Sequence, residues 1–289
     1  MASDNMQDIK RRIKSVTSTE HITNAMKLVS AGKLRKAKAI FEKTNENSHY
    51  ITHTIAEIFN NSKEIPEHYL AGNREIKTTC YIVVTSCRGL CGGFNTNVLK
   101  AAQHEIDLDW EEPLIIAIGD RGREYFEKRG YNVYSDYLAP PENISFLETR
   151  EMSAPVIDMY NRGEIDEVML IYTSFISSME QEVKTVTLLP FEIESDPDIM
   201  KNSKPVEYEP SVEAVFNYLV PKYVEMMIHA AVVESATCEH AARRTAMENA
   251  TDNAREMLEQ LSLNYNRARQ SAITDEIIEI VAGSEEVDR

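Results

Sequence analysis

Residues 222–282 read KYVEMMIHAAVVESATCEHAARRTAMENATDNAREMLEQLSLNYNRARQSAITDEIIEIVA. This run of 61 residues contains no glycine and no proline, the two residues that most disfavour a helix interior. At about 1.5 Å per residue, one unbroken helix of this length would extend for about 90 Å, far beyond an ordinary globular helix. The stretch therefore predicts a single long C-terminal helix.

A packing seam recurs along this stretch at alternating steps of four and three residues. Such heptad spacing favours a left-handed coil with a partner helix. Many seam positions are small or polar instead of leucine or isoleucine, so the coil should bury little apolar area for its length. The seam consists of Met226, Ala230, Val233, Thr237, His240, Arg244, Met247, Thr251, Ala254, Leu258, Leu261, Tyr265, Ala268 and Ala272.

The N-terminal 60 residues predict the partner helix. Gly32 is their only glycine, and the first proline of the chain is Pro66. A helix of roughly 50 residues would extend for about 80 Å, and a small residue at position 32 would suit close contact with another helix. An intermittent apolar stripe follows this segment at Ile9, Ile13, Val16, Met26, Val29, Leu34, Ala37 and Ile40.

Residues 66–210 differ in composition, because they hold nearly all of the prolines and glycines. Short β-rich runs alternate here with helical patterns, which predicts a mainly parallel sheet with an antiparallel hairpin at its edge. A polar connector follows at 196–210, Ser211 could cap a short helix, and Pro221 is expected to kink or restart it. The expected strands are 79–85, 114–118, 131–134, 167–174 and 182–193, and the expected helices are 96–106, 121–129 and 146–162.

These patterns predict an α/β protein in which the N- and C-terminal helices form a long antiparallel two-helix coiled coil around an inserted Rossmann-like α/β domain. The expected divisions are 1–65, 66–210 and 211–289. Because the C-terminal helix is the longer one, its tip should extend alone beyond the first helix, and another protein must then surround its apolar side chains. These side chains are Ile273, Ile277, Ile278, Ile280 and Val281.

The charge distribution and the cysteine content of the chain limit the classes of function that the sequence supports. The net charge is −16, and residues 1–43 carry +6, so the remaining residues carry −22. A basic arm can bind nucleic acid, but this one lacks interleaved aromatic residues, so an acidic protein partner or a solvated helix face is favoured. Four cysteines without a paired framework fit a reducing compartment, and no run of 18 apolar residues predicts a membrane span.

The loop at residues 86–95, SCRGLCGGFN, follows the first expected strand and precedes a helix. A phosphate cradle would lie there in an α/β fold, but the loop matches neither common glycine-rich pattern and no Walker lysine follows. A tight strand-to-helix turn with positive φ is the favoured interpretation. Cys87 and Cys91 lack a second pair of metal ligands nearby.

No persuasive active site can be argued from the remaining residues. The seven histidines form no ligand cluster, and the pair His49 and His53 at a four-residue spacing is more typical of a helix surface. No nucleophile–base spacing and no carboxylate pair stands out. We therefore expect no catalytic residues, no metal and no cofactor.

Four stretches carry a resemblance to a known family. They are IKRRIKSV (9–16) followed by ITNAMKLV (22–29), RGLCGGFN (88–95), RTAMENATDNA (244–254) and YNRARQSAITDEIIE (265–279). In this order, the chain resembles the gamma subunits of F-type ATP synthases, the central rotor shaft. The family usually has an acidic residue before the arginine of the loop, where this chain has Cys87.

The resemblance implies a non-catalytic central-stalk subunit that couples the flow of protons or sodium ions to ATP synthesis or hydrolysis on beta subunits. Its partners would be a hexamer of alpha and beta subunits, the epsilon subunit and the membrane c-ring, with no nucleic acid. The chain would lie at the cytoplasmic face of the bacterial plasma membrane, associated with the membrane only through the complex.

The resemblance also implies two sets of partner-contact residues. Arg269, Gln270, Thr274 and Glu276 near the tip would contact a beta loop. Met26 and Lys27, with the basic face of Lys33, Arg35 and Lys36, would meet an acidic segment of beta. Two alternatives from other classes are a static coiled-coil scaffold and a nucleotide-binding α/β enzyme with helical arms.

Overall fold

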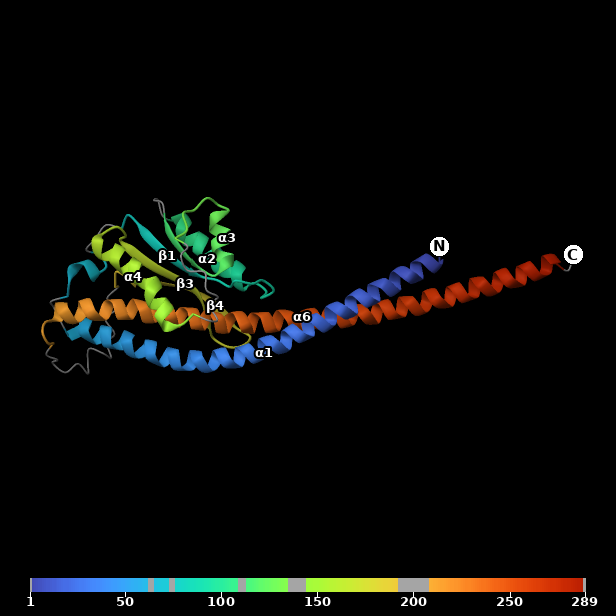
Figure 1. Cartoon of the computed structure of the whole chain (residues 1–289), viewed down its shortest axis with the longest axis horizontal. Helices are drawn as coiled ribbons and strands as arrows, with labels where there is room; N and C mark the ends of the chain where they lie inside the picture. The colour runs from blue at the N-terminus through green and yellow to red at the C-terminus, as the bar shows by residue number, and fades with distance from the viewer. Residues whose placement is uncertain are drawn as a thin grey trace. The chain divides into compact units, whose positions relative to one another are not determined.

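A computed structural model describes residues 2–61, 65–72, 76–108, 113–134, 144–191 and 208–287 (Figure 1). The chain forms two compact units, which we call the coil unit (Met1–Ser30 with Arg244–Arg289) and the head unit (Ala31–Arg243). The elements are α1 (Ala2–Asn61), the 3-10 turn η1 (Glu67–Tyr69), β1 (Thr79–Val84), α2 (Phe94–Leu108), β2 (Leu114–Ile118), α3 (Asp120–Glu127), α4 (Phe146–Arg162), β3 (Glu167–Phe175), β4 (Gln181–Leu189) and α6 (Val212–Val287).

The sheet of the head unit has the strand order β2-β1-β3-β4. The central strand β1 pairs in parallel with β2 on one side and with β3 on the other. The last strand, β4, pairs with β3 in the antiparallel direction. The predicted parallel sheet with an antiparallel edge hairpin is therefore confirmed.

Successive residues of β1 enter two different hydrophobic cores, as the two-residue period of a strand requires. Cys80, Ile82 and Val84 pack with α4 and α6, whereas Tyr81 and Val83 pack with α2 and α3. Figure 1 shows α2 and α3 on the opposite face of the sheet from α4 and α6. Packing on both faces explains why every residue of β1 is buried and why all but Thr79 at its start are largely apolar instead of alternating with polar residues.

Most of the predicted elements lie close to the observed ones, and one expected strand is wrong. The helix at 146–162 and the strand at 114–118 have the predicted bounds, and the other matching elements differ at their ends. The expected strand at 131–134 is only an isolated bridge, in which Val133 pairs with Ile115. Among residues 131–134, Val133 pairs with Ile115 and the amide of Tyr134 donates to the carbonyl of Ile115 at 2.8 Å, and no longer ladder forms.

α6 begins where the sequence predicted but does not restart at Pro221. Ser211 Oγ accepts a hydrogen bond from the amide of Ala214 at 3.2 Å, which confirms the cap. The helix continues through Pro221, although an internal proline costs about 3 kcal/mol. Burial of Val220 and Val224 on either side offsets this cost, because both pack in the larger core.

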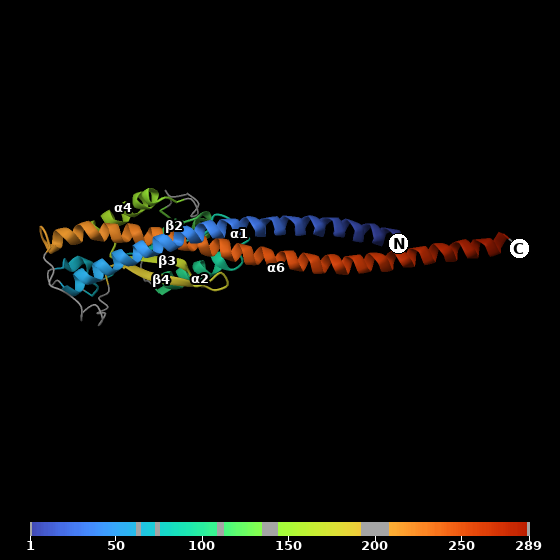
Figure 2. The same ribbon diagram turned by 90° about the horizontal axis from the view of Figure 1, so that it is seen from below.

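The coil unit has the predicted heptad seam. From Met247 to Ala272 every predicted seam position is buried or half-buried, but Arg244 is exposed. Across the seam, Arg255 Nη2 lies 3.1 Å from Glu20 Oε1. Four residues earlier on α6, Thr251 Oγ1 donates to Thr23 Oγ1 at 2.9 Å. Residue numbers thus rise along α6 as they fall along α1, and with the side-by-side ribbons in Figure 2 this shows that the two helices run antiparallel in the coil unit.

Three expectations for α1 are wrong. Val29 and Ile40 are exposed, by 60% and 45%, and an added Cβ on Gly32 would meet nothing within 4 Å. The observed seam uses Ser30, Leu34 and other residues at heptad spacing instead, so these three positions face away from α6.

Several predicted features fall outside the described residues. The connector at 196–210 is described only from residue 208 onward, and the side chains of Ile280 and Val281 are not described. The division of the chain at 65/66 and 210/211 remains a prediction.

Candidate functional site

The loop after β1 is closed by its own side chains. Ser86 Oγ donates a hydrogen bond to the carbonyl of Arg88 at 2.7 Å, and Asn95 Oδ1 accepts the amide of Ser86 at 3.0 Å. Leu90 and Gly92 have positive φ values of 62° and 59°. The predicted tight turn is confirmed.

The loop presents carbonyl oxygens, not amide groups, to its neighbour on α6. Arg243 Nη2 donates to the carbonyls of Arg88 and Gly89, each at 3.3 Å. The same guanidinium lies 2.6 Å from Glu239 Oε1. Carbonyl oxygens repel phosphate, so the observed arrangement does not support a phosphate cradle.

α6 also occupies the place where α/β folds usually bind ligands. The chain leaves β1 toward β2 and later returns to β3 on the other side, so a topological switch point lies at the carboxyl ends of β1 and β3. There the amide of Thr173 donates to Ser235 Oγ at 3.2 Å, and the amide of Phe175 donates to Glu234 Oε1 at 2.8 Å. Side chains of α6 therefore fill the crevice.

Burial keeps the cysteine thiols and the Tyr172 hydroxyl around this crevice neutral by raising the pKa of each. Burial, and secondarily the charge of Glu234, raises the pKa of the Cys238 thiol well above its usual range. Burial likewise raises the pKa of Tyr172, Cys87 and Cys91. A reactive cysteine needs a lowered pKa, so these thiols have the character of structural groups.

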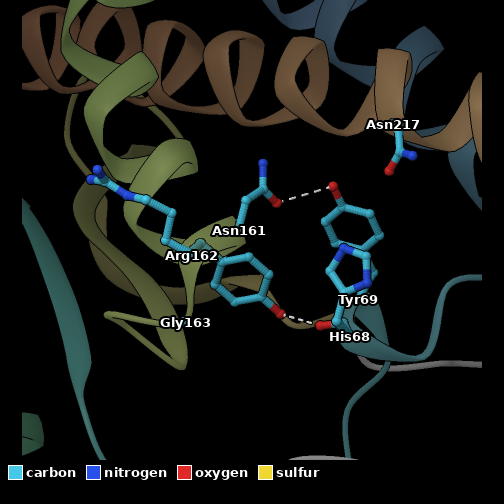
Figure 3. Close-up of a pocket in the computed structure, with 7 residues that line it drawn as sticks. His68, Tyr69, Asn161, Arg162, Gly163 and Asn217 are labelled. Carbon is cyan, nitrogen blue, oxygen red and sulfur yellow. Dashed lines mark hydrogen bonds between the residues drawn. The ribbon is translucent and has the colours of Figure 1, made fainter.

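A cavity of about 450 Å³ lies elsewhere in the head unit (Figure 3). The Tyr160 hydroxyl donates to the carbonyl of His68 at 2.6 Å, and the Tyr69 hydroxyl donates to Asn161 Oδ1 at 3.3 Å. Because both hydroxyl protons are used in hydrogen bonds within the protein, the lining has the character of structural packing and not of a reactive site. The lining residues are His68, Tyr69, Tyr160, Asn161, Arg162, Gly163 and Asn217.

The predicted contact residues near the tip are all exposed. Arg269, Gln270, Thr274 and Glu276 lie outside the seam on α6. Thr274 Oγ1 donates to the backbone carbonyl of Gln270 at 2.9 Å, which orders this turn of the surface.

Exposed isoleucines accompany these polar residues. Ile273, Ile277 and Ile278 are 49%, 56% and 59% exposed. All three follow Ala272, the last half-buried seam position. The described part of the tip therefore combines polar and apolar groups that the chain itself leaves accessible.

The predicted contact residues of α1 fall into two groups. Met26 and Lys27 belong to the coil unit, where Lys27 is only 22% exposed and its Nζ lies 3.9 Å from Glu248 Oε1. Lys33, Arg35 and Lys36 belong to the head unit and are exposed.

Sequence reasoning missed several apolar side chains that face solvent in the coil unit. Ile22, Leu28 and Val29 on α1 are at least 60% exposed, and Met257 and Leu263 on α6 are more than half exposed. Apolar residues outside the heptad seam were the signal that could have revealed them.

Two further absences hold for the residues that the structure describes. Among them, no three histidine, cysteine, aspartate or glutamate side chains come together as a metal site. Within the same ranges, the helices lack a segment long and apolar enough to span a bilayer.

Comparison with known proteins identifies relatives along the whole chain. A family model described as ATP synthase matches residues 5–287. The ATP synthase gamma chain of Alkaliphilus metalliredigens is 46% identical over 284 residues, which cover 97% of this chain and 98% of that one. A gamma chain of Acetobacterium woodii, named as sodium ion specific, is 39% identical over 98% of this chain and 99% of its own length.

Solved structures share the fold. A chain in the Euglena gracilis mitochondrial ATP synthase (OSCP/F1/c-ring, rotational state 3) has a TM-score of 0.73 at 18% sequence identity. The match covers 99% of this chain and 95% of that one.

Proposed function

The chain belongs to the ATP synthase gamma-chain family, and from this premise we propose which of its surfaces meet which partners. As a family member it is a non-catalytic central-stalk subunit, the rotor of the complex, and ATP is made or hydrolysed on the beta subunits. Family membership sets aside both alternatives, the static scaffold and the nucleotide-binding enzyme.

The proposed partners are a hexamer of alpha and beta subunits around the coil unit, the epsilon subunit beside the head unit, and a membrane c-ring. The complex would hold the chain at the cytoplasmic face of a bacterial plasma membrane. Rotation of the coil would bias each beta subunit in turn between open and closed forms. The free energy with which a beta subunit binds nucleotide would then be coupled to the rotational angle of the coil.

One observation supports this proposal most strongly, namely the exposed isoleucines beyond Ala272 on α6. Apolar side chains of this size in a group require a cover, and a sleeve of alpha and beta subunits would supply it. Arg269, Gln270, Thr274 and Glu276 share this part of α6, which favours their proposed contact with a beta loop.

The basic residues of α1 would meet an acidic segment of beta. Lys33, Arg35 and Lys36 are exposed and carry three positive charges within four residues. Met26 and Lys27 would contribute a smaller contact, because Lys27 already lies beside Glu248. We also propose that 1–65, 66–210 and 211–289 are the functional divisions of the chain.

Co-expression with alpha, beta and epsilon subunits tests the assignment. We expect a stable complex that hydrolyses ATP and turns a probe attached to the head unit. A complex in which the chain co-purifies but does not rotate would favour a scaffold, and failure to bind alpha and beta would refute the proposal.

A further inference from the structure

We propose that Glu234, Ser235 and Arg243 of α6 form a joint that fixes this helix to the sheet of the head unit. Through the joint, torque would pass between α6 and the sheet. The inference rests on the proposed rotor function and concerns contacts within the head unit alone. It assigns a mechanical role to three side chains that touch neither nucleotide nor another subunit in the proposed function.

The first half of the joint holds the carboxyl end of β3. Glu234 Oε1 accepts hydrogen bonds from Ser174 Oγ at 2.7 Å and from the amide of Phe175 at 2.8 Å. Two residues earlier on the strand, the amide of Thr173 donates to Oγ of the adjacent helix residue, Ser235, at 3.2 Å. Two neighbouring residues of the helix thus bind three consecutive residues of the strand.

The second half holds the loop after β1. Arg243 donates to the carbonyls of Arg88 and Gly89, and Glu239 orients its guanidinium from one helical turn earlier. The Arg243 side chain is only 11% exposed, so these bonds are partly shielded from water. The joint therefore binds the carboxyl end of β3 and the loop that follows the neighbouring strand β1, at the same edge of the sheet.

Directional bonds add to the attachment here because α6 leaves the larger core nearby and continues only along a small apolar cluster of Cys238, Cys91 and Phe94. Val232 is the last residue of α6 in that core cluster, and the polar anchors begin two residues later. Apolar contact is non-directional, so it resists separation better than sliding. Hydrogen bonds to main-chain groups lose strength steeply when the angle changes, and they oppose rotation of the helix against the sheet.

Angular fluctuation of the rotor in the assembled complex tests this role. The chain would be combined with alpha, beta and epsilon subunits, and a bead on the head unit would be followed while nucleotide holds the hexamer at rest. In the Glu234→Ala/Ser235→Ala variant, the angular variance should rise roughly twofold, because two of three anchoring side chains lose their directional bonds. Glu234→Gln keeps an acceptor oxygen and should stay near the wild type.

Thr237→Ala is the matched control. Thr237 is fully buried on the same helix, but its hydroxyl donates to the carbonyl of Val233 within α6 at 3.0 Å. The Thr237→Ala variant should have a lower melting temperature than the wild type but the same angular variance. If the double variant does not assemble, Ser235→Ala alone takes its place in the same comparison.

The outcomes separate the joint from the rotor assignment. Equal variance in the wild type, the control and the joint variant, all rotating, would overturn the joint and leave the rotor function standing. A wild-type complex that does not rotate would instead refute the rotor function on which the joint depends.

Discussion

Arg243 and Arg244 are adjacent in the chain but have different environments. Arg243 is nearly buried, and its guanidinium meets the carboxylate of Glu239 and two carbonyl oxygens. Arg244 is exposed, although heptad spacing assigned it to the seam. A buried charge is stable only with hydrogen-bonding partners, so the partners available, not the spacing, decide which arginine is buried.

Residue-scale predictions begin with the exposed polar pair near the tip. Arg269→Ala/Gln270→Ala should leave the coil folded, because alanine favours helix and the half-buried seam residues are untouched. A hydrogen bond to a charged partner is worth on the order of 1.5–3 kcal/mol. If such bonds form at only some rotational angles, ATP turnover in the complex should fall by roughly ten-fold.

The control for this variant is Lys33→Ala/Arg35→Ala/Lys36→Ala, on an exposed basic face. Its effect should be milder and should depend on salt, as expected for solvated charges. ATPase rate and complex yield are measured for both. Wild-type turnover by an assembled Arg269→Ala/Gln270→Ala complex would show that the site assignment is wrong.

His229 predicts how stability depends on pH. Its Nδ1 lies 3.2 Å from Thr149 Oγ1, and burial lowers its pKa below the ordinary value. Below about pH 6.5 the unfolded chain therefore binds a proton that the folded chain excludes, so this residue makes stability fall as pH decreases through that range. Melting temperatures at about pH 7.5 and 5.5 should show a smaller difference in His229→Gln.

The exposed His104→Gln on α2 is the control for this measurement. It should leave the wild-type difference in melting temperature unchanged. An unchanged difference in His229→Gln as well would contradict the role of His229.

At the scale of elements, α6 changes its surroundings along its length. In the head unit it is packed against the sheet and α4, and residues 231–241 are buried with one exception. In the coil unit, from Thr251 onward, only the seam positions are buried or half-buried, and after Ala272 the described side chains are exposed. One helix thus passes from a buried core position through a coil seam to a segment whose described side chains are exposed.

The decrease in burial along α6 predicts that its C-terminal end is the least stable part of the helix in the free chain. Backbone amides after about Tyr265 should exchange quickly with solvent, because few contacts protect that end of α6. In the complex they should become strongly protected. Hydrogen exchange with equal protection in both states would argue against a surrounding sleeve.

A second prediction at this scale concerns a polar contact in the coil. Thr251 is buried, and its Oγ1 donates to Thr23 Oγ1 at 2.9 Å. Replacing both partners by apolar groups of the same shape can be nearly neutral. Thr23→Val/Thr251→Val should therefore change the free energy of unfolding by no more than about 1 kcal/mol.

Urea unfolding of the double variant provides the measurement. Met247→Ala, at a buried seam position, is the comparison and should cost about 2–5 kcal/mol. A double variant as destabilised as Met247→Ala would mean that the hydroxyl pair, and not packing, maintains the coil.

At the scale of the whole molecule, the head unit is an α/β fold whose usual ligand crevice is filled by its own helix. Glu234, Ser235 and Arg243 occupy the carboxyl ends of β1 and β3, where such folds often hold phosphates. The crevice therefore binds the chain's own helix α6, in agreement with membership of a non-catalytic family.

The isolated chain should accordingly bind no nucleotide. Titration calorimetry with ATP should show no saturable heat, since the loop after β1 turns carbonyl oxygens toward Arg243. Binding of ATP at a stoichiometry near one would refute this expectation.

The sequence by itself determined the two long helices, the α/β character of the middle region and the approximate positions of most of its elements. Freedom from glycine and proline, heptad spacing and buried apolar runs are local properties, and local patterns predict local structure well. The motifs at both ends of the chain also indicated the family.

Only the tertiary structure decided which side chains those elements bury. Periodicity placed Val29 and Ile40 on the packed stripe, yet the register with α6 leaves both exposed. Pro221 was expected to kink or restart the helix, yet α6 continues through it. The filling of the crevice by α6 joins residues 59 or more positions apart. Such contacts depend on how whole elements pack, and no short window of sequence contains that information.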